Sequence, residues 1–167
     1  MKLARLVLIL LVTGSLGSQQ PASDIRSELA AIDLRHPRDL NDYLARCSQV
    51  RTYIPRLEEF YKQGNVTIAR LKQQHSTDAD FVRMAGFFER WNAQDRVGLE
   101  IVKEKLQASS DMALLPASKR QAFFDARIKP IQKREDDNVL VEVDMARKAQ
   151  KDGIPLPADI TKWLQSH

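Results

Sequence analysis

The sequence predicts an all-α protein, an antiparallel bundle of three long, kinked helices with short N- and C-terminal helices. Apolar residues recur at spacings of three and four along most of the chain, which is the pattern of amphipathic helices. Capping-box patterns at residues 77–80 (TDAD) and 118–121 (SKRQ) mark the starts of new helices. Three segments of similar length with short connections favour antiparallel neighbours. A four- to five-helix bundle is the alternative if Pro55 breaks its helix completely.

Residues 1–17 have the features of a cleaved export signal. Lys2 and Arg5 form a positively charged start, residues 6–12 (LVLILLV) form an apolar core, and small residues follow up to Gly17. We expect cleavage near Gly17, which places the protein in the periplasm or outside the cell. The apolar run is far shorter than the roughly 20 residues that span a bilayer. An uncleaved signal-anchor is the alternative.

Residues 18–22 are expected to form a flexible leader, and residues 23–167 a single helical domain with its own core. The whole chain carries 26 basic and 22 acidic residues, and loss of the two basic residues of the signal leaves a net charge of +2. Acidic and basic residues alternate, as in KREDD at residues 133–137, whereas a nucleic-acid-binding protein gathers basic residues on one face. The composition therefore argues against a nucleic-acid partner.

A short helix is expected after the leader. Ser23 can cap it, and Ile25, Leu29 and Ile32 then lie on one face, spaced by four and three residues. This helix ends before Pro37, because the residue before a proline avoids the α conformation. Pro37 itself suits the first turn of the next helix, where its missing N–H has no partner to lose.

The first long helix is expected over residues 37–75. Its apolar seam consists of Leu40, Tyr43, Cys47, Val50, Ile54, Leu57, Tyr61, Gly64, Ile68, Leu71 and His75. Pro55 and Gly64 are weak points within it. Because the seam keeps its spacing through both, one long, bent helix is favoured over several independent helices.

The second and third long helices follow the two capping boxes. The seam of the second consists of Phe81, Met84, Phe88, Trp91, Asp95, Leu99, Val102 and Leu106. Residues 107–116 interrupt that pattern and are expected to form a connection. The apolar residues of the third are Phe124, Ile128, Ile131, Val139, Val143 and Ala146. Pro130 is a kink site within the third helix, which ends near Gly153.

Two segments near the C-terminus need separate arguments. Residues 138–145 (NVLVEVDM) alternate as a strand does, but no partner strand is evident and an isolated strand leaves its backbone groups unpaired. A helix is therefore favoured there. Residues 157–167 are expected to form a short helix with Ile160, Trp163 and Leu164 on one side, which docks on the body of the bundle.

Histidine and cysteine usage argues against a metal or cofactor. The three histidines and the single cysteine form no cluster with zinc-ligand spacing, and the Glu-x-x-His pairs of di-iron bundles do not occur. Non-covalent haem held by His75 and a methionine such as Met84 is the remaining cofactor hypothesis. The competing interpretation is a histidine at a helix end and a methionine that fills the core. We expect no cofactor.

Asp95 and Glu135 are the catalytic candidates. Both fall on apolar seams, and two inward-facing carboxylates can serve as the acid and base of a hydrolase-type enzyme. The competing interpretation is that each carboxylate pairs with an arginine at the bundle surface. Cys47 lies on a seam, where a buried thiol behaves as a small apolar residue. The balance is against an enzyme, and no catalytic residue is assigned.

Aromatic residues are the candidates for binding. The set consists of Phe81, Phe87, Phe88, Trp91 and Trp163. Phe87 lies off the apolar seam of its helix by about 100°. One explanation is a wide buried face that packs against two neighbours. The functional alternative is an apolar groove that holds a lipid, a peptide or an unfolded chain.

These features together predict an exported helical binding or scaffold protein of the cell envelope. A small periplasmic adaptor, a chaperone-like protein and a helical scaffold are the three forms that fit, and we expect the protein to bind a protein or peptide partner through its helix faces without a cofactor. Contact with a membrane surface is not indicated by the sequence. The alternatives are a lipid or haem carrier bundle and a hydrolase that uses Asp95 and Glu135. Asn65 heads an N-glycosylation pattern, Asn-Val-Thr, which carries little weight because such tripeptides are common.

Overall fold

The computed structural model describes residues 28–29, 31–32, 34 and 36–165. Within these residues the secondary structure is helical, without strands, which confirms the all-α prediction. The helices are α3 (Leu40–Arg51), α4 (Ile54–Gln74), α5 (Ala79–Ala113), α6 (Ala117–Phe123), the π-helical turn η1 (Phe124–Ile128), α7 (Lys129–Lys151) and α8 (Ala158–Gln165). The expected signal, its cleavage site, the leader and most of the first short helix lie outside the described residues.

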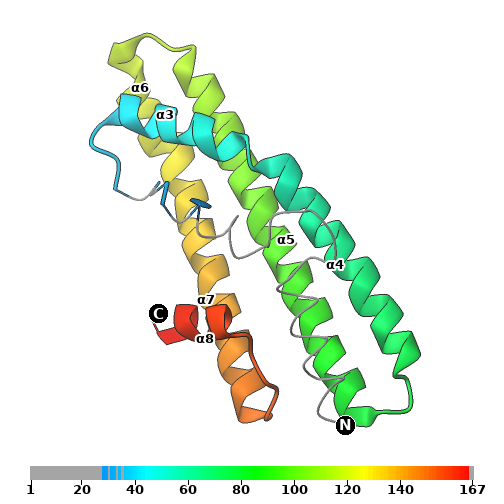
Figure 1. The fold of residues 1–167 in the computed structure, drawn as a ribbon. Helices are drawn as coiled ribbons and strands as arrows, with labels where there is room; N and C mark the ends of the chain where they lie inside the picture. Colours follow the sequence, from blue (N-terminus) through cyan, green and yellow to red (C-terminus); the bar gives the residue numbers. More distant parts are fainter. Residues whose placement is uncertain (1–27, 30, 33, 35, 166–167) are drawn as a thin grey trace.

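The longest helix, α5, is the centre of the fold. Figure 1 shows α4 antiparallel to α5 on one side and α7 antiparallel to it on the other. Near the C-terminal end of α5, α3 crosses it at a steep angle, and at the opposite end of the molecule α8 packs against α7. The three long helices therefore line up with α5 in the middle, while α3 crosses them near one end and α8 lies against the side of α7 toward the other.

The segment predicted as one bent helix over residues 37–75 consists of two helices. α3 ends at Arg51 and α4 begins at Ile54, with Pro55 in the first turn of α4. Pro55 has no N–H to donate to the carbonyl of Arg51, so a continuous helix would lose that hydrogen bond. The expectation of a single bent helix is wrong here, because Pro55 separates two helices that run in different directions (Figure 1).

The helix starts differ by one to three residues from the sequence prediction. The side chain of Asp39 accepts hydrogen bonds from two backbone N–H groups and caps α3, so that helix begins after Pro37 rather than at it. Asp78, not Thr77, caps α5 through the N–H of Phe81. Both carboxylates sit where orphan N–H groups need an acceptor. α6 begins one residue before Ser118 and has no side-chain cap.

The connection predicted at residues 107–116 is wrong for most of its length. α5 continues to Ala113, and Ala108, Ser109 and Met112 are buried. Ser109, Ser110 and Asp111 have modest helix propensity, but the buried residues of this segment pack against the apolar side chains of α3, and tertiary packing overrides propensity. The connection to α6 is limited to residues 114–116.

The third long helix is continuous but contains one wide turn. In η1 the N–H of Lys129 bonds to the carbonyl of Phe124, five residues back, where an α-helix would use four. Pro130 follows directly and cannot donate a backbone hydrogen bond, and both prolines and single π-turns are sites where a helix departs from regular α geometry. Pro130 therefore affects the helix locally, as predicted. The helix ends at Lys151, close to Gly153, which adopts a φ of 69°.

The hydrophobic core has two parts. The part at the α3 end contains Tyr43, Cys47, Val50, Ile101, Leu106, Ala108, Met112, Ile128 and Ile131. The part at the α8 end contains Ile68, Leu71, Phe81, Met84, Ala85, Phe87, Phe88, Trp91, Val143, Ala146, Ala149, Ile154, Ile160 and Leu164. The predicted seams supply most of both parts, and α8 docks through Ile160 and Leu164 as the sequence predicted.

Polar side chains link the helices between the two parts of the core. The Nδ2 of Asn92 on α5 donates to the carbonyl of Tyr61 (3.0 Å) and to the Oδ1 of Asn65 (2.6 Å) on α4. On the other side of α5, the Nε2 of Gln94 donates to the Oδ1 of Asn138 on α7 (2.7 Å). These bonds satisfy buried amides, so they set the register of α5 against both neighbours.

Candidate functional site

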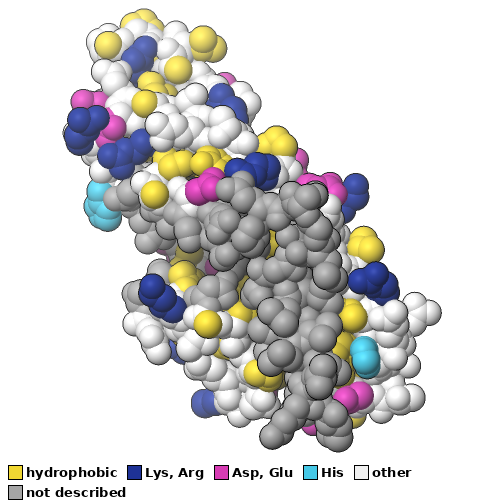
Figure 2. Space-filling view, in the orientation of Figure 1, with side chains coloured by type: hydrophobic (Ala, Val, Ile, Leu, Met, Phe, Trp, Pro, Cys, Tyr) yellow, Lys and Arg dark blue, Asp and Glu magenta, His cyan; other side chains and the backbone are white. Residues whose placement is uncertain are grey.

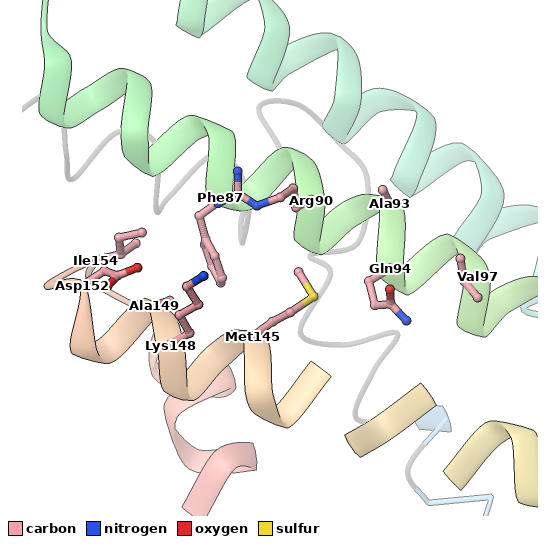
Figure 3. Close-up of a pocket in the computed structure, with 10 residues that line it drawn as sticks. All are labelled: Phe87, Arg90, Ala93, Gln94, Val97, Met145, Lys148, Ala149, Asp152 and Ile154. Atoms are coloured by element: carbon pink, nitrogen blue, oxygen red, sulfur yellow. The ribbon is translucent and has the colours of Figure 1, made fainter. Parts of the chain in front are cut away.

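A groove of about 500 Å³ lies between α5 and α7 (Figure 3). Its volume falls within the range of about 300–1,000 Å³ that small-molecule sites occupy. Phe87 points from α5 toward α7, and Met145 points from α7 toward α5. Ala93 on α5 and Ala149 on α7 contribute no bulk to fill the space between them. The groove thus exists where small side chains on both helices leave room.

The floor of the groove is apolar. Phe87, Ala149 and Ile154 are buried, and Met145 is half-buried. Val97 lies at the far end of the groove and is 50% exposed, which is high for a large apolar side chain. An apolar ligand along this floor would remove these surfaces from water, the main source of binding free energy for such sites.

The mouth of the groove carries charge. Arg90, Lys148 and Asp152 border it, and all three are exposed. Within the described residues, the side chains of Arg90 and Lys148 form no ion pair or hydrogen bond. Some cations elsewhere form ion pairs between helices, as in Lys72 with Glu89 (2.6 Å). The two cations at the groove are therefore available to an anionic group of a ligand.

Charges elsewhere on the surface are of mixed sign. Figure 2 shows Lys and Arg side chains interspersed with Asp and Glu over the described part of one face. Interhelical ion pairs account for several of them, including Lys103 with Glu58 (2.9 Å) and Arg134 with Glu104 (2.8 Å). Such exposed pairs contribute little to stability, typically about 0–1 kcal/mol each.

The structure places the five aromatic candidates in two settings. Phe81 and Phe88 are enclosed in the core, each 1% exposed. Phe87 lines the groove and contacts Trp91, with ring centroids 5.7 Å apart, and Trp91 meets Trp163 of α8 edge-to-face at 6.1 Å. A chain of rings thus runs from the groove floor to α8. Of the five aromatic candidates, Phe87, the residue off the seam, is the one among the described residues that line the groove.

The two catalytic candidates do not form a carboxylate pair. Glu135 on α7 pairs with the buried ammonium of Lys105 on α5. Lys105 lies ten residues beyond Asp95 on the same helix, about 15 Å at 1.5 Å per residue. Asp95 is half-buried on α5. The partner of Glu135 is thus a lysine in the interior, whereas the sequence suggested an arginine at the surface.

A closed polar cluster lies beside this ion pair. The Oγ of Ser109 donates to the Oη of Tyr43 at 3.4 Å and lies 3.3 Å from the Sγ of Cys47. Burial raises the pKa of the Tyr43 phenol above its ordinary range, and the nearby Glu135 raises it further. Tyr43, Cys47 and Ser109 are 0–2% exposed. A substrate has no access to these groups, and a phenol with a raised pKa is a poor base at neutral pH.

The haem candidates occupy structural positions. His75 ends α4, where its N–H bonds to the carbonyl of Leu71, and its ring stacks on Phe81 with centroids 4.5 Å apart. Met84 is 3% exposed and packs in the core at the α8 end. Among the residues that the structure describes, no group of three or more His, Cys, Asp or Glu side chains is arranged to hold a metal ion.

No protein-family model, curated protein or solved structure matches this chain. Across the described ranges, no helix has both the length and the hydrophobicity needed to cross a bilayer.

Sequence reasoning missed Arg90, Met145 and Lys148, which shape the groove. A signal for them exists, because Phe87, Arg90, Gln94 and Val97 recur at spacings of three and four, one residue out of step with the main seam. That second stripe mixes apolar and polar residues, so it does not stand out by hydrophobicity. A groove forms because this stripe faces Met145, Lys148 and Ala149 of α7.

Proposed function

We propose that this protein works by binding a ligand in the groove between α5 and α7, without a cofactor, as an exported protein of the cell envelope. The observation that carries this proposal is an apolar floor combined with two cations at the mouth, Arg90 and Lys148, that have no ion-pair partner among the described residues. Buried apolar surface supplies affinity and a few polar groups supply orientation, which is the usual composition of ligand sites. The export signal predicted at residues 1–17 supports the location.

Binding is favoured over catalysis because the groups that could react are inaccessible. Tyr43, Cys47 and Ser109 are enclosed by α3 and α5, and Glu135 is neutralised by Lys105. Among the described residues that line the groove, Asp152 is the one carboxylate. Acid–base hydrolysis needs two suitably placed groups. The geometry therefore supports a binding site better than a hydrolase centre.

The groove can be tested by filling it. Ala93→Leu places a larger side chain at an exposed position that lines the groove, so folding should be unaffected. We expect the neutral apolar dye N-phenyl-1-naphthylamine to bind the wild-type chain with increased fluorescence, and this signal to fall at least fivefold in Ala93→Leu. Ala69→Leu, at an exposed position of α4, is the matched control. Equal dye binding by all three proteins would refute the groove as the site.

A protein partner is the second candidate, and exposed side chains of α7 favour it. Leu140 is 63% exposed and Val141 is 47% exposed, an unusual pair of adjacent apolar residues on a helix surface. The variant Leu140→Asp/Val141→Asp should abolish co-purification of a partner from the envelope while dye binding by the groove persists. Retention of the partner by this variant would count against the second candidate.

A further inference from the structure

We infer that the ligand of the α5–α7 groove is a single-chain anionic amphiphile, a fatty-acid-like molecule with its alkyl chain on the apolar floor and its carboxylate at Arg90 and Lys148. This inference rests on the proposed function, since it names the class of ligand for the same groove. Three observations lead to it: the shape of the groove, the chemistry of its walls and the charge at its mouth.

The groove is long and narrow. Phe87 and Val97 border it ten residues apart on α5, a length of about 15 Å at 1.5 Å per residue. The empty space of the groove, with the open solvent at its mouth included, is about 980 Å³, so the mean cross-section over that length is at most about 65 Å², a width of about 9 Å. An α-helix with its side chains is about 10–12 Å in diameter, so the body of a helix does not fit. A single extended chain does.

The walls disfavour a peptide as that extended chain. Each residue of a peptide brings an N–H and a C=O that need partners when they leave water. Most of the lining belongs to the helices α5 and α7, whose backbone groups bond within the helix. Gln94, a polar side chain of the lining, already donates to Asn138 at 2.7 Å. An alkyl chain has no polar groups, so it gives up no hydrogen bonds to water when it enters the groove.

The mouth favours an anionic head group. Arg90 on α5 and Lys148 on α7 flank the groove from opposite sides, and neither has a partner among the described residues. Asp152, the remaining charge, lies beside Ile154 in Figure 3, so the two cations outnumber it. A guanidinium can bind both oxygens of a carboxylate at once, and an ammonium adds a second charge. A cationic head group would meet two like charges.

The test compares head groups on one alkyl chain. Dodecanoate and dodecyltrimethylammonium, each below its critical micelle concentration, are titrated into the purified full chain by calorimetry. Tryptophan fluorescence gives a second readout, because Trp91 contacts the groove residue Phe87. We expect dodecanoate to bind at least tenfold more tightly than the cation. Arg90→Gln/Lys148→Gln should weaken dodecanoate binding at least tenfold and leave the neutral dye unaffected.

A matched control distinguishes the effect of the two cations at the groove from the effect of a lower net positive charge. Arg70→Gln/Lys119→Gln removes one exposed arginine and one exposed lysine away from the groove and should leave dodecanoate binding unchanged. If the dye binds the groove but the cation binds as well as dodecanoate, the inference about the head group is overturned while the proposed function stands. If Ala93→Leu affects neither dye nor dodecanoate, the proposed function fails as well.

Discussion

Lys105 of α5 extends into the bundle interior and meets the carboxylate of Glu135 on α7, with 2% of the lysine side chain exposed and 27% of the glutamate. The pair lies at the end of the molecule where α3 crosses, next to Tyr43 and Ser109. An ammonium in the interior is costly unless it is paired. The pair therefore links α5 to α7 at a position where mispairing would be strongly unfavourable.

Removal of the Glu135 charge and removal of the Lys105 charge should lower the stability of the fold by different amounts. Glu135→Gln leaves the Lys105 charge buried without its counter-ion and should destabilise the fold by about 3 kcal/mol. Lys105→Met keeps the length of the side chain, removes the buried charge and leaves Glu135 able to reach water, so it should cost about 1 kcal/mol or less. Urea unfolding of the two variants measures both values. Equal losses, or a larger loss in Lys105→Met, would contradict this account.

Two helix glycines make a matched pair of predictions. A Cβ at Gly64 would lie 3.4 Å from the Nδ2 of Asn92, an ordinary contact, so Gly64→Ala should gain helix propensity and stabilise by about 0.5–1 kcal/mol. A Cβ at Gly98 would lie 3.1 Å from the Nδ2 of Asn138, and this side chain is held at both ends, because its Nδ2 donates to Glu142 and its Oδ1 accepts from Gln94. Gly98→Ala should therefore be neutral or destabilising in the same urea experiment, and an equal gain for both would refute the packing argument.

Tyr43 should make the protein sensitive to alkali. Burial raises the pKa of its phenol in the folded state, whereas an unfolded chain has a phenol pKa of about 10. Below pH 10 both states keep the proton and the contribution of Tyr43 to stability is intact. Above pH 10 the unfolded state releases the proton first, so stability should fall by up to about 1.4 kcal/mol for each pH unit.

The control for this prediction is Tyr43→Phe. The difference in free energy of unfolding between the wild type and this variant should shrink as the pH rises from about 9 to 11. Tyrosinate absorbance should show one of the three tyrosines ionising only on unfolding. A pH-independent difference would mean that the Tyr43 phenol ionises normally in the folded protein.

The docking of α8 should depend on Trp163. An eight-residue helix is not stable alone, and Trp163 holds α8 through its edge-to-face contact with Trp91. Trp163→Ala should lower stability by about 2 kcal/mol, and Trp163→Phe, which keeps a ring, should lower it less. Because the chain has two tryptophans, Trp91 is the sole emitter in both variants. Its emission should shift to the red in Trp163→Ala, and identical spectra would contradict the prediction.

Local signals account for what could be predicted of the fold. The three- and four-residue spacing of apolar side chains identified the helices, and Tyr43, Phe88 and Val143 of the predicted seams are buried. These local signals gave a wrong prediction where tertiary packing determines the secondary structure. Residues 107–113 look like a loop by composition, and they are helical because α3 covers them.

The candidate site was predictable only in part. Phe87 was singled out because it lies off the seam of its helix, and it lines the groove. Arg90 and Lys148, in contrast, resemble any exposed cation in the sequence. What distinguishes them is that both border the groove, and this depends on the side chains that α5 and α7 bring opposite each other.

From the sequence one could predict the helical fold, the apolar face of most helices, and the two prolines, Pro55 and Pro130, at which regular helix geometry is disturbed, but not that Pro55 separates two helices. These properties depend on hydrogen bonds and spacings within a few residues. Tertiary structure decided the direction of α3, the pairing of Lys105 with Glu135, and the groove. Each of these depends on how far neighbouring helices are rotated and shifted against each other, and the periodicity of a single helix leaves that free.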